Sequence, residues 1–209
     1  MAKKLTERKV MEALDWTYDK AINGVLGLDS AEELAASYAD SGQSPTKRAN
    51  ALIRRQIVKA GTSGFLAGLG GLLITPVTVP ANLLSVWYVQ IRMIAAIAHM
   101  GGHHLKDDKV RTLVFTCLAE NAAKDILKDM GIVVGKQLSK QAVKAIPSKT
   151  IVAINQAVGF RLLTKFGEKG AGSLGKAIPL IGGVIGGTFD SVSTNTIGNV
   201  ARDTFIGKK

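Results

Sequence analysis

Cysteine and aromatic residues are scarce in this sequence, and each shortage narrows the class of protein. A single cysteine, Cys117, among 209 residues excludes an internal disulfide and fits a reducing compartment such as the cytoplasm. Aromatic residues make up only 5% of the chain. That is fewer than a β-sandwich usually contains, and it leaves few platforms for stacking nucleic-acid bases. We therefore expect neither a β-rich fold nor a nucleic-acid partner.

Charge is absent from one long stretch, residues 60–91, a run of 32 residues without a charged side chain. A membrane-spanning helix needs about 20 apolar residues, but Pro76 and Pro80 divide this run in the middle. Its first half is short and rich in glycine, and the helix expected after Pro80 contains several polar side chains. We therefore predict an apolar helical hairpin over residues 61–100 rather than a clean transmembrane span.

Glycine, by contrast, is abundant, with 23 residues. Several glycines are spaced three or four residues apart within two apolar segments, residues 61–74 and 177–200, so they share one face of a helix. Such faces let helix backbones approach closely, and they need a compensating contact because each glycine costs a helix about 1 kcal/mol relative to alanine. We predict that the hairpin packs against the second segment through these faces. The candidate helix-packing residues are Gly64, Gly68, Gly71, Gly182, Gly183, Gly186 and Gly187.

The remaining pattern is helical almost throughout. Apolar residues recur at helical spacing over residues 4–22, and Gly24 predicts the end of that helix. Ser30 and Glu33 form a capping-box sequence, which predicts the start of a second helix. The length suits one domain and no tandem repeat is visible. Residues 1–209 therefore predict an all-α, single-domain multi-helix bundle with a central glycine-rich apolar hairpin.

The stretch GAGSLGKA, residues 170–177, matches the dinucleotide-binding spacing G-x-G-x-x-G and most of a phosphate-binding P-loop. A P-loop requires a buried strand before the glycines and a serine or threonine after the lysine. The preceding stretch RLLTKFGEK is charged and amphipathic, and Ala177 follows Lys176. We interpret GAGSLGKA as a turn between helices and predict no nucleotide cofactor.

Three histidines lie close together, and His99 and His103 have the four-residue spacing of metal ligands on a helix. Two glycines between them predict the end of that helix, and no acidic or cysteine cluster flanks them. Cys117 falls on an apolar stripe, which is typical of a core residue rather than a nucleophile. We predict no metal site and no catalytic residues, and we favour a non-enzymatic protein.

The net charge of +11 is unevenly distributed. Residues 1–40 contain eight acidic and five basic residues, a balance of −3, so the rest of the chain carries +14. Such a charge suits anionic lipid, nucleic acid or an acidic partner, and charge alone does not choose among them. The residues that we predict to form a basic surface are Lys136, Lys140, Lys144, Lys149, Lys165, Lys169 and Lys176.

Arg92 ends the long uncharged run inside an apolar helix. A buried arginine is costly unless it is paired. Two interpretations stay open: Arg92 pairs within the bundle, with Glu120 or Asp190, and fixes the helix register, or it faces a cavity and holds an anionic head group. The candidate lipid- or ligand-binding residues are Asn82, Gln90, Arg92, Asn155 and Arg161.

Five stretches carry a resemblance to a known family: YDKAINGVLGLDSAEELAASY, LIRRQIVKAGTSGFLAGLGGLLITPVTVPANL, VQIRMIAAIAHMGG, NQAVGFRLLTKFGEKG and LGKAIPLIGGVIGG. Over residues 16–205 the chain resembles the EcsC family of bacterial proteins. The resemblance implies a helical protein without an agreed enzymatic activity. By the family's name it also implies an association with an operon that encodes an ABC transporter.

These observations lead to one principal hypothesis and two alternatives. We expect a non-enzymatic helical protein, peripheral to the cytoplasmic face of the inner membrane, that binds anionic lipid or an acyl chain. The first alternative is a regulator or assembly partner of an ABC transporter. The second is an enzyme that acts on a hydrophobic substrate at a site around Arg92 and Gln90.

Overall fold

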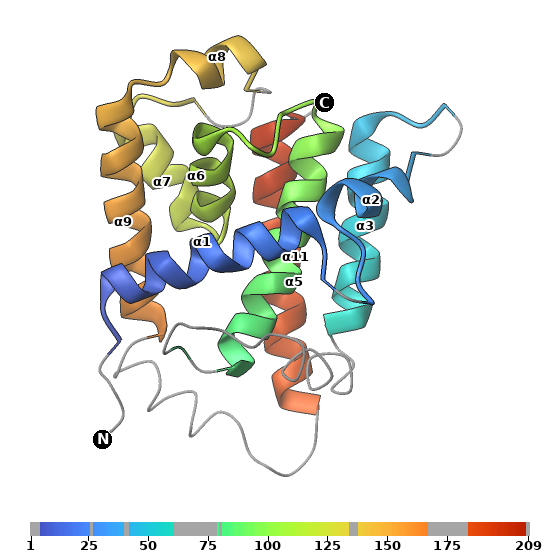
Figure 1. The fold of residues 1–209 in the computed structure, drawn as a ribbon. Coiled ribbons are helices and arrows are strands. Elements are labelled where there is room, and N and C mark those ends of the chain that lie inside the picture. Colours follow the sequence, from blue (N-terminus) through green and yellow to red (C-terminus); the bar gives the residue numbers. More distant parts are fainter. Residues whose placement is uncertain are drawn as a thin grey trace.

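The computed structural model is a set of helices packed around one long central helix (Figure 1). The residues that it describes are 5–25, 27–39, 42–60, 79, 81–133, 138–166 and 184–207. Within these ranges the chain forms helices and no β-strand, with one isolated bridge between Val25 and Leu28. The all-α prediction is therefore confirmed.

The first three helices begin where the sequence provides caps. They are α1 (Glu7–Asn23), α2 (Ala31–Ala36) and α3 (Pro45–Ala60). Ser30 and Glu33 form the capping box that the sequence predicts, because each backbone N–H donates to the other side chain, at 2.8 and 3.2 Å. Pro45 is the first residue of α3. The N–H of a first helical residue has no partner within the helix, so a proline, which lacks this N–H, costs nothing there.

The rest of the described chain adds the central helix and the elements around it. These are α5 (Ala81–Met100), α6 (Asp108–Cys117), α7 (Ala122–Asp129), α8 (Lys140–Ala145), α9 (Ser148–Phe166) and α11 (Val184–Phe205). Side chains again cap the starts: Asp107 accepts from the Lys109 N–H at 2.8 Å, and Ser139 accepts from the Ala142 N–H at 3.1 Å.

Helix α5 is the core of the fold, and it packs against α1, α2, α3, α6 and α11. Among the described residues it is the one helix long and apolar enough to cross a membrane, with a mean hydropathy of 1.4 over Leu83–Met100. However, 83% of that window is buried inside the protein. Burying a side chain such as Ile91 or Ile94 contributes about 1.5–3 kcal/mol, so α5 uses its apolar surface to hold the bundle together.

The second arm of the predicted hairpin is therefore a helix, while the first arm, residues 61–78, lies outside the described residues. The predicted packing glycines at 64, 68, 71, 182 and 183 also lie outside them. Gly186 and Gly187 belong to α11, in a part whose packing the structure does not describe. Glycine-to-glycine packing of these two segments stays a prediction.

A different glycine brings two helices close together. A Cβ atom on Gly198 of α11 would lie 2.7 Å from Cγ1 of Ile53 on α3, closer than side chains normally approach. One turn further along α11, Arg202 Nη1 donates to Asn50 Oδ1 at 2.7 Å. Later residues of α11 thus meet earlier residues of α3, so the two helices run antiparallel, and only hydrogen at position 198 permits this spacing.

Four helix ends lie at the same end of the bundle (Figure 1). Helices α3 and α9 finish there, at Ala60 and Phe166, and α5 and α11 begin there, at Ala81 and Val184. We call this the lower end, after its place in Figure 1. Trp87 of α5 and Phe166 of α9 meet near it, edge to face with their ring centroids 5.8 Å apart. The final turn of α11 lies at the opposite end.

Two glycine-to-alanine variants test the close approach of α3 and α11. Gly198→Ala should lower the free energy of unfolding by about 1–2 kcal/mol, because the new methyl overpacks against Ile53. Gly159→Ala, in the middle of α9, should instead raise it by up to about 1 kcal/mol. There a Cβ would meet Met11 at an ordinary 3.5 Å. Urea unfolding measures both variants, and equal effects would contradict the proposed contact.

Candidate functional site

Arg92 lies inside the bundle, with only 4% of its surface exposed. Its Nη1 donates to the backbone carbonyl of Asp29 at 3.1 Å, and its guanidinium carbon lies 5.5 Å from the centroid of the Tyr88 ring. Asp29 directly precedes Ser30, the cap of α2. Arg92 thus connects the central helix to the loop before α2, and its partners among the described residues are a carbonyl and an aromatic face.

Of the two acidic partners considered for Arg92, the described structure tests only Glu120. Glu120 binds Lys165 and Ser193 instead, and the side chain of Asp190 lies outside the described residues. The Arg92 Nε and the Tyr88 hydroxyl are buried and have no hydrogen-bond partner in the described part of the chain. A buried polar group without a partner costs about 1–3 kcal/mol, so this cluster keeps unused hydrogen-bonding capacity in the core.

The other candidate ligand-binding residues occupy different environments. Gln90 is buried on α5, and the Asn155 Oδ1 atom is buried on α9 and accepts no hydrogen bond from the described residues. Arg161, also on α9, is exposed. Asn82 belongs to α5, but its side chain lies outside the described part. The structure thus distributes these residues over two helices. Among their described side chains, Arg92 has a hydrogen bond and a ring contact, and Arg161 acts on the charge of Glu120.

A cluster that the sequence analysis missed joins three segments of the chain. Glu120 lies in the turn between α6 and α7, and its Oε1 accepts from Lys165 Nζ of α9 at 2.6 Å and from Ser193 Oγ of α11 at 2.5 Å. Its backbone φ is 57°, which makes it the one described non-glycine residue in the left-handed region. That conformation costs a residue other than glycine about 1–2 kcal/mol, so the contacts of the side chain hold the backbone in place. No spacing in the sequence signals this arrangement.

The chemistry of this cluster suits a structural clamp better than catalysis. Burial alone would raise the pKa of the Glu120 carboxyl, but the hydrogen bonds from Lys165 and Ser193 and the charge of Arg161 outweigh it, so the pKa falls below its ordinary value. A serine nucleophile needs a base that takes up its proton. Because Glu120 holds its proton so weakly, it is a poor base for Ser193.

Two further reactive side chains, Cys117 and His103, are enclosed, whereas His99 and His104 are exposed. Burial raises the pKa of the Cys117 thiol to about 12, so it stays protonated and unreactive at neutral pH. Burial lowers the pKa of His103, whose ring packs edge-on against Phe205 with centroids 5.2 Å apart. Among the described residues, no three His, Cys, Asp or Glu side chains are placed to hold a metal ion.

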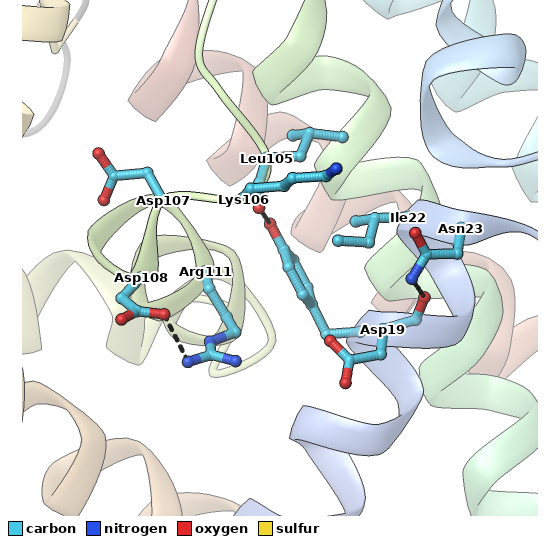
Figure 2. A pocket seen from close by; sticks show the side chains of 9 residues that line it. Asp19, Ile22, Asn23, Leu105, Lys106, Asp107, Asp108 and Arg111 are labelled. Carbon is cyan, nitrogen blue, oxygen red and sulfur yellow. Dashed lines mark hydrogen bonds and ion pairs between the residues drawn. The ribbon is translucent and has the colours of Figure 1, made fainter.

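A polar cavity of about 240 Å³ lies between the end of α1 and the start of α6 (Figure 2). Two of its acidic side chains, Asp107 and Asp108, already have structural roles. Asp107 caps α6, and Asp108 Oδ1 binds Arg111 Nη2 at 2.6 Å. Tyr18 donates its hydroxyl to the Leu105 carbonyl at 2.6 Å, across the same cavity. These contacts fasten α1 to the loop before α6.

The predicted basic surface is only partly brought together. Lys140 and Lys144 of α8 and Lys149 at the start of α9 are exposed, and we call these three residues the lysine arm. Lys165 lies at the other end of α9 and pairs with Glu120. Lys136, Lys169 and Lys176 lie outside the described residues.

Two further features accompany this charge. Residues 130–167 contain six basic residues and no acidic one. A groove of about 410 Å³, lined mainly by apolar side chains such as Ile132, Val133 and Ile146, lies between the end of α7, α8 and the start of α9. Among the described residues, the large hydrophobic side chains that stay exposed are Val58 at 71%, Val133 at 70%, Val152 at 56%, Phe160 at 62% and Val192 at 68%.

Comparison with known proteins gives one match. A model of the EcsC protein family matches residues 4–206, nearly the whole chain. No curated protein matches the sequence, and no solved structure matches it either.

Substitutions at Arg92 separate its packing from its hydrogen bond. Arg92→Ala should lower the free energy of unfolding by about 2–5 kcal/mol, because it leaves a cavity in the core. Arg92→Met fills most of that volume and removes a buried charge, so its loss should be smaller by at least about 1 kcal/mol. Urea unfolding compares the two variants. Equal losses would show that the bond to the Asp29 carbonyl outweighs packing.

The Glu120 cluster predicts a specific pH dependence. The lowered pKa of Glu120 means that its contribution to stability is fully present above its ordinary pKa of 4.5 and is lost as the pH falls through the lower folded value. Glu120→Gln should therefore reduce the loss of melting temperature between about pH 4.5 and pH 3. Lys165→Gln should reduce it as well. An unchanged acid dependence in both variants would contradict the clamp.

Proposed function

This chain belongs to the EcsC protein family, and we propose that it is a non-enzymatic, membrane-associated protein that binds anionic lipid at the cytoplasmic face of the membrane. The observation that carries the proposal is the meeting of four helix ends at the lower end of the bundle. These ends border residues 61–80 and 167–183, which include the charge-free stretches 61–80 and 177–183. The described helix ends that flank both apolar stretches in the sequence thus lie at one end of the bundle.

The charge of the chain supports the same conclusion. Its net charge is +11, and the exposed cations include Arg54 and Arg55 of α3 and Arg161 of α9. Near an anionic membrane surface each basic residue contributes about 1 kcal/mol of attraction. The described helices bury their apolar faces against each other, and α5 in particular is a core helix. Association through one end of the bundle therefore leaves the helical core intact.

Vesicle flotation tests this function. We expect the purified protein to float with phosphatidylcholine vesicles that contain phosphatidylglycerol and to remain unbound with phosphatidylcholine alone. Raising the salt from about 0.05 M to 0.5 M should weaken binding, because the Debye length then falls from about 14 Å to about 4 Å. A protein that stays wholly in the soluble fraction at low salt would refute the proposal. Co-purification with a transporter, independent of lipid charge, would favour the alternative of a transporter partner.

A further inference from the structure

Two exposed surfaces of the bundle carry both cations and apolar side chains. One is the lysine arm with the neighbouring Val133 and Val152, and the other is the lower end of the bundle. We infer that the protein stands end-on on an anionic bilayer, with Val58, Phe160 and Val192 entering the interface and Arg54, Arg55 and Arg161 binding lipid phosphates. This inference rests on the proposed function and specifies which face of the molecule meets the lipid.

Helix register places the three apolar side chains near the lower end. Val58 is two residues from the end of α3, Phe160 is six from the end of α9, and Val192 is eight from the start of α11. At a rise of 1.5 Å per residue, these positions lie about 3, 9 and 12 Å from the respective helix ends. All three side chains are more than half exposed, so water covers apolar surface on three different helices at this end.

The other two exposed hydrophobic side chains lie toward the opposite end. Val152 is four residues from the start of α9, which is the far end of that helix. Val133 lines the apolar groove together with Leu138. The Leu138 N–H donates to the carbonyl of Thr204, at the final turn of α11, at 3.1 Å. Hydrophobic side chains of similar exposure thus lie toward both ends of the bundle.

Arginines accompany the lower apolar side chains. Arg54 and Arg55 are exposed one turn before Val58 on α3, and Arg161 directly follows Phe160 on α9. The apolar stem of an arginine can lie along the interface while its guanidinium reaches toward a phosphate. That planar group binds phosphate with two parallel hydrogen bonds. Exposed apolar side chains next to arginines therefore suit contact with a phospholipid surface better than contact with water.

The lysine arm is too far from this end to share the same contact. Lys149 precedes Arg161 by 12 residues on α9, which places them about 18 Å apart along the helix. At physiological ionic strength charges are screened beyond about 8 Å. In an end-on orientation the lysine arm therefore contributes little to binding, although three lysines within ten residues form the more conspicuous pattern in the sequence.

Site-specific fluorescence measures which end of the protein contacts the bilayer. The single native thiol, Cys117, is fully buried, so an introduced surface cysteine is labelled selectively. Val192→Cys and Val133→Cys carry an environment-sensitive dye such as NBD at two positions of matched exposure. With phosphatidylcholine–phosphatidylglycerol vesicles, the dye at position 192 should gain intensity and shift to the blue. The dye at position 133 should keep its aqueous spectrum.

Variants that remove positive charge provide the second part of the experiment. Arg54→Gln with Arg55→Gln should weaken vesicle binding about tenfold or more, since each cation contributes about 1 kcal/mol. Lys140→Gln with Lys144→Gln removes the same charge from the lysine arm and should change binding less than about twofold. Circular dichroism and thermal unfolding verify that each variant is folded.

The outcomes distinguish the end-on orientation from the proposed binding of anionic lipid. If the wild type binds anionic vesicles but the dye responds at position 133, or the lysine variants abolish binding, the end-on orientation is wrong and the proposed function stands. If the wild type binds no vesicles at all, both fail. A response at position 192 together with sensitivity to the Arg54 and Arg55 changes supports the orientation.

Discussion

Five helices bury their apolar faces against α5, a helix that is itself apolar along almost its whole length. The same helix contains Arg92, whose charge has left water for a backbone carbonyl and an aromatic face. Desolvating a charge costs several kcal/mol, and a single neutral acceptor offsets only part of that cost. The packing around α5 must supply the difference. Arg92 in turn fixes the loop before α2, so its position determines where that helix can dock.

Apart from buried groups such as Arg92 and Asp203, most charged side chains of the described residues lie around this core. The acidic N-terminal part supplies caps and surface pairs, such as Glu33 in the capping box. The basic excess falls on the outer sides of α3, α8 and α9. Because these cations lie at both ends of the bundle, net charge alone explains attraction to an anionic surface but not the orientation of the molecule on it. Orientation depends on the exposed apolar side chains that accompany the cations.

Local features of the fold could be predicted from the sequence. The capping box of Ser30 and Glu33 and the helix that follows Pro80 were both found where the spacing indicated. The features that join distant segments could not. Arg92 binds the carbonyl of Asp29, and every residue has a carbonyl, so no side-chain pattern identifies it. Glycine spacing predicted close packing in the two apolar stretches, yet the tightest contacts among the described glycines are made by Gly101 and Gly198, which were not among the predicted packing residues.

The left-handed backbone at Glu120 has a consequence for the evolution of the family. Glycine adopts this conformation without strain. A mutation of Glu120 to glycine would therefore relieve the backbone strain at this position. It would also leave Lys165 and Ser193 without their shared acceptor. Descendant lineages should therefore either retain an acidic residue with both partners or exchange all three positions together. Covariation among these sites would show that an unstrained backbone at position 120 and the contacts of Glu120 with Lys165 and Ser193 are alternatives.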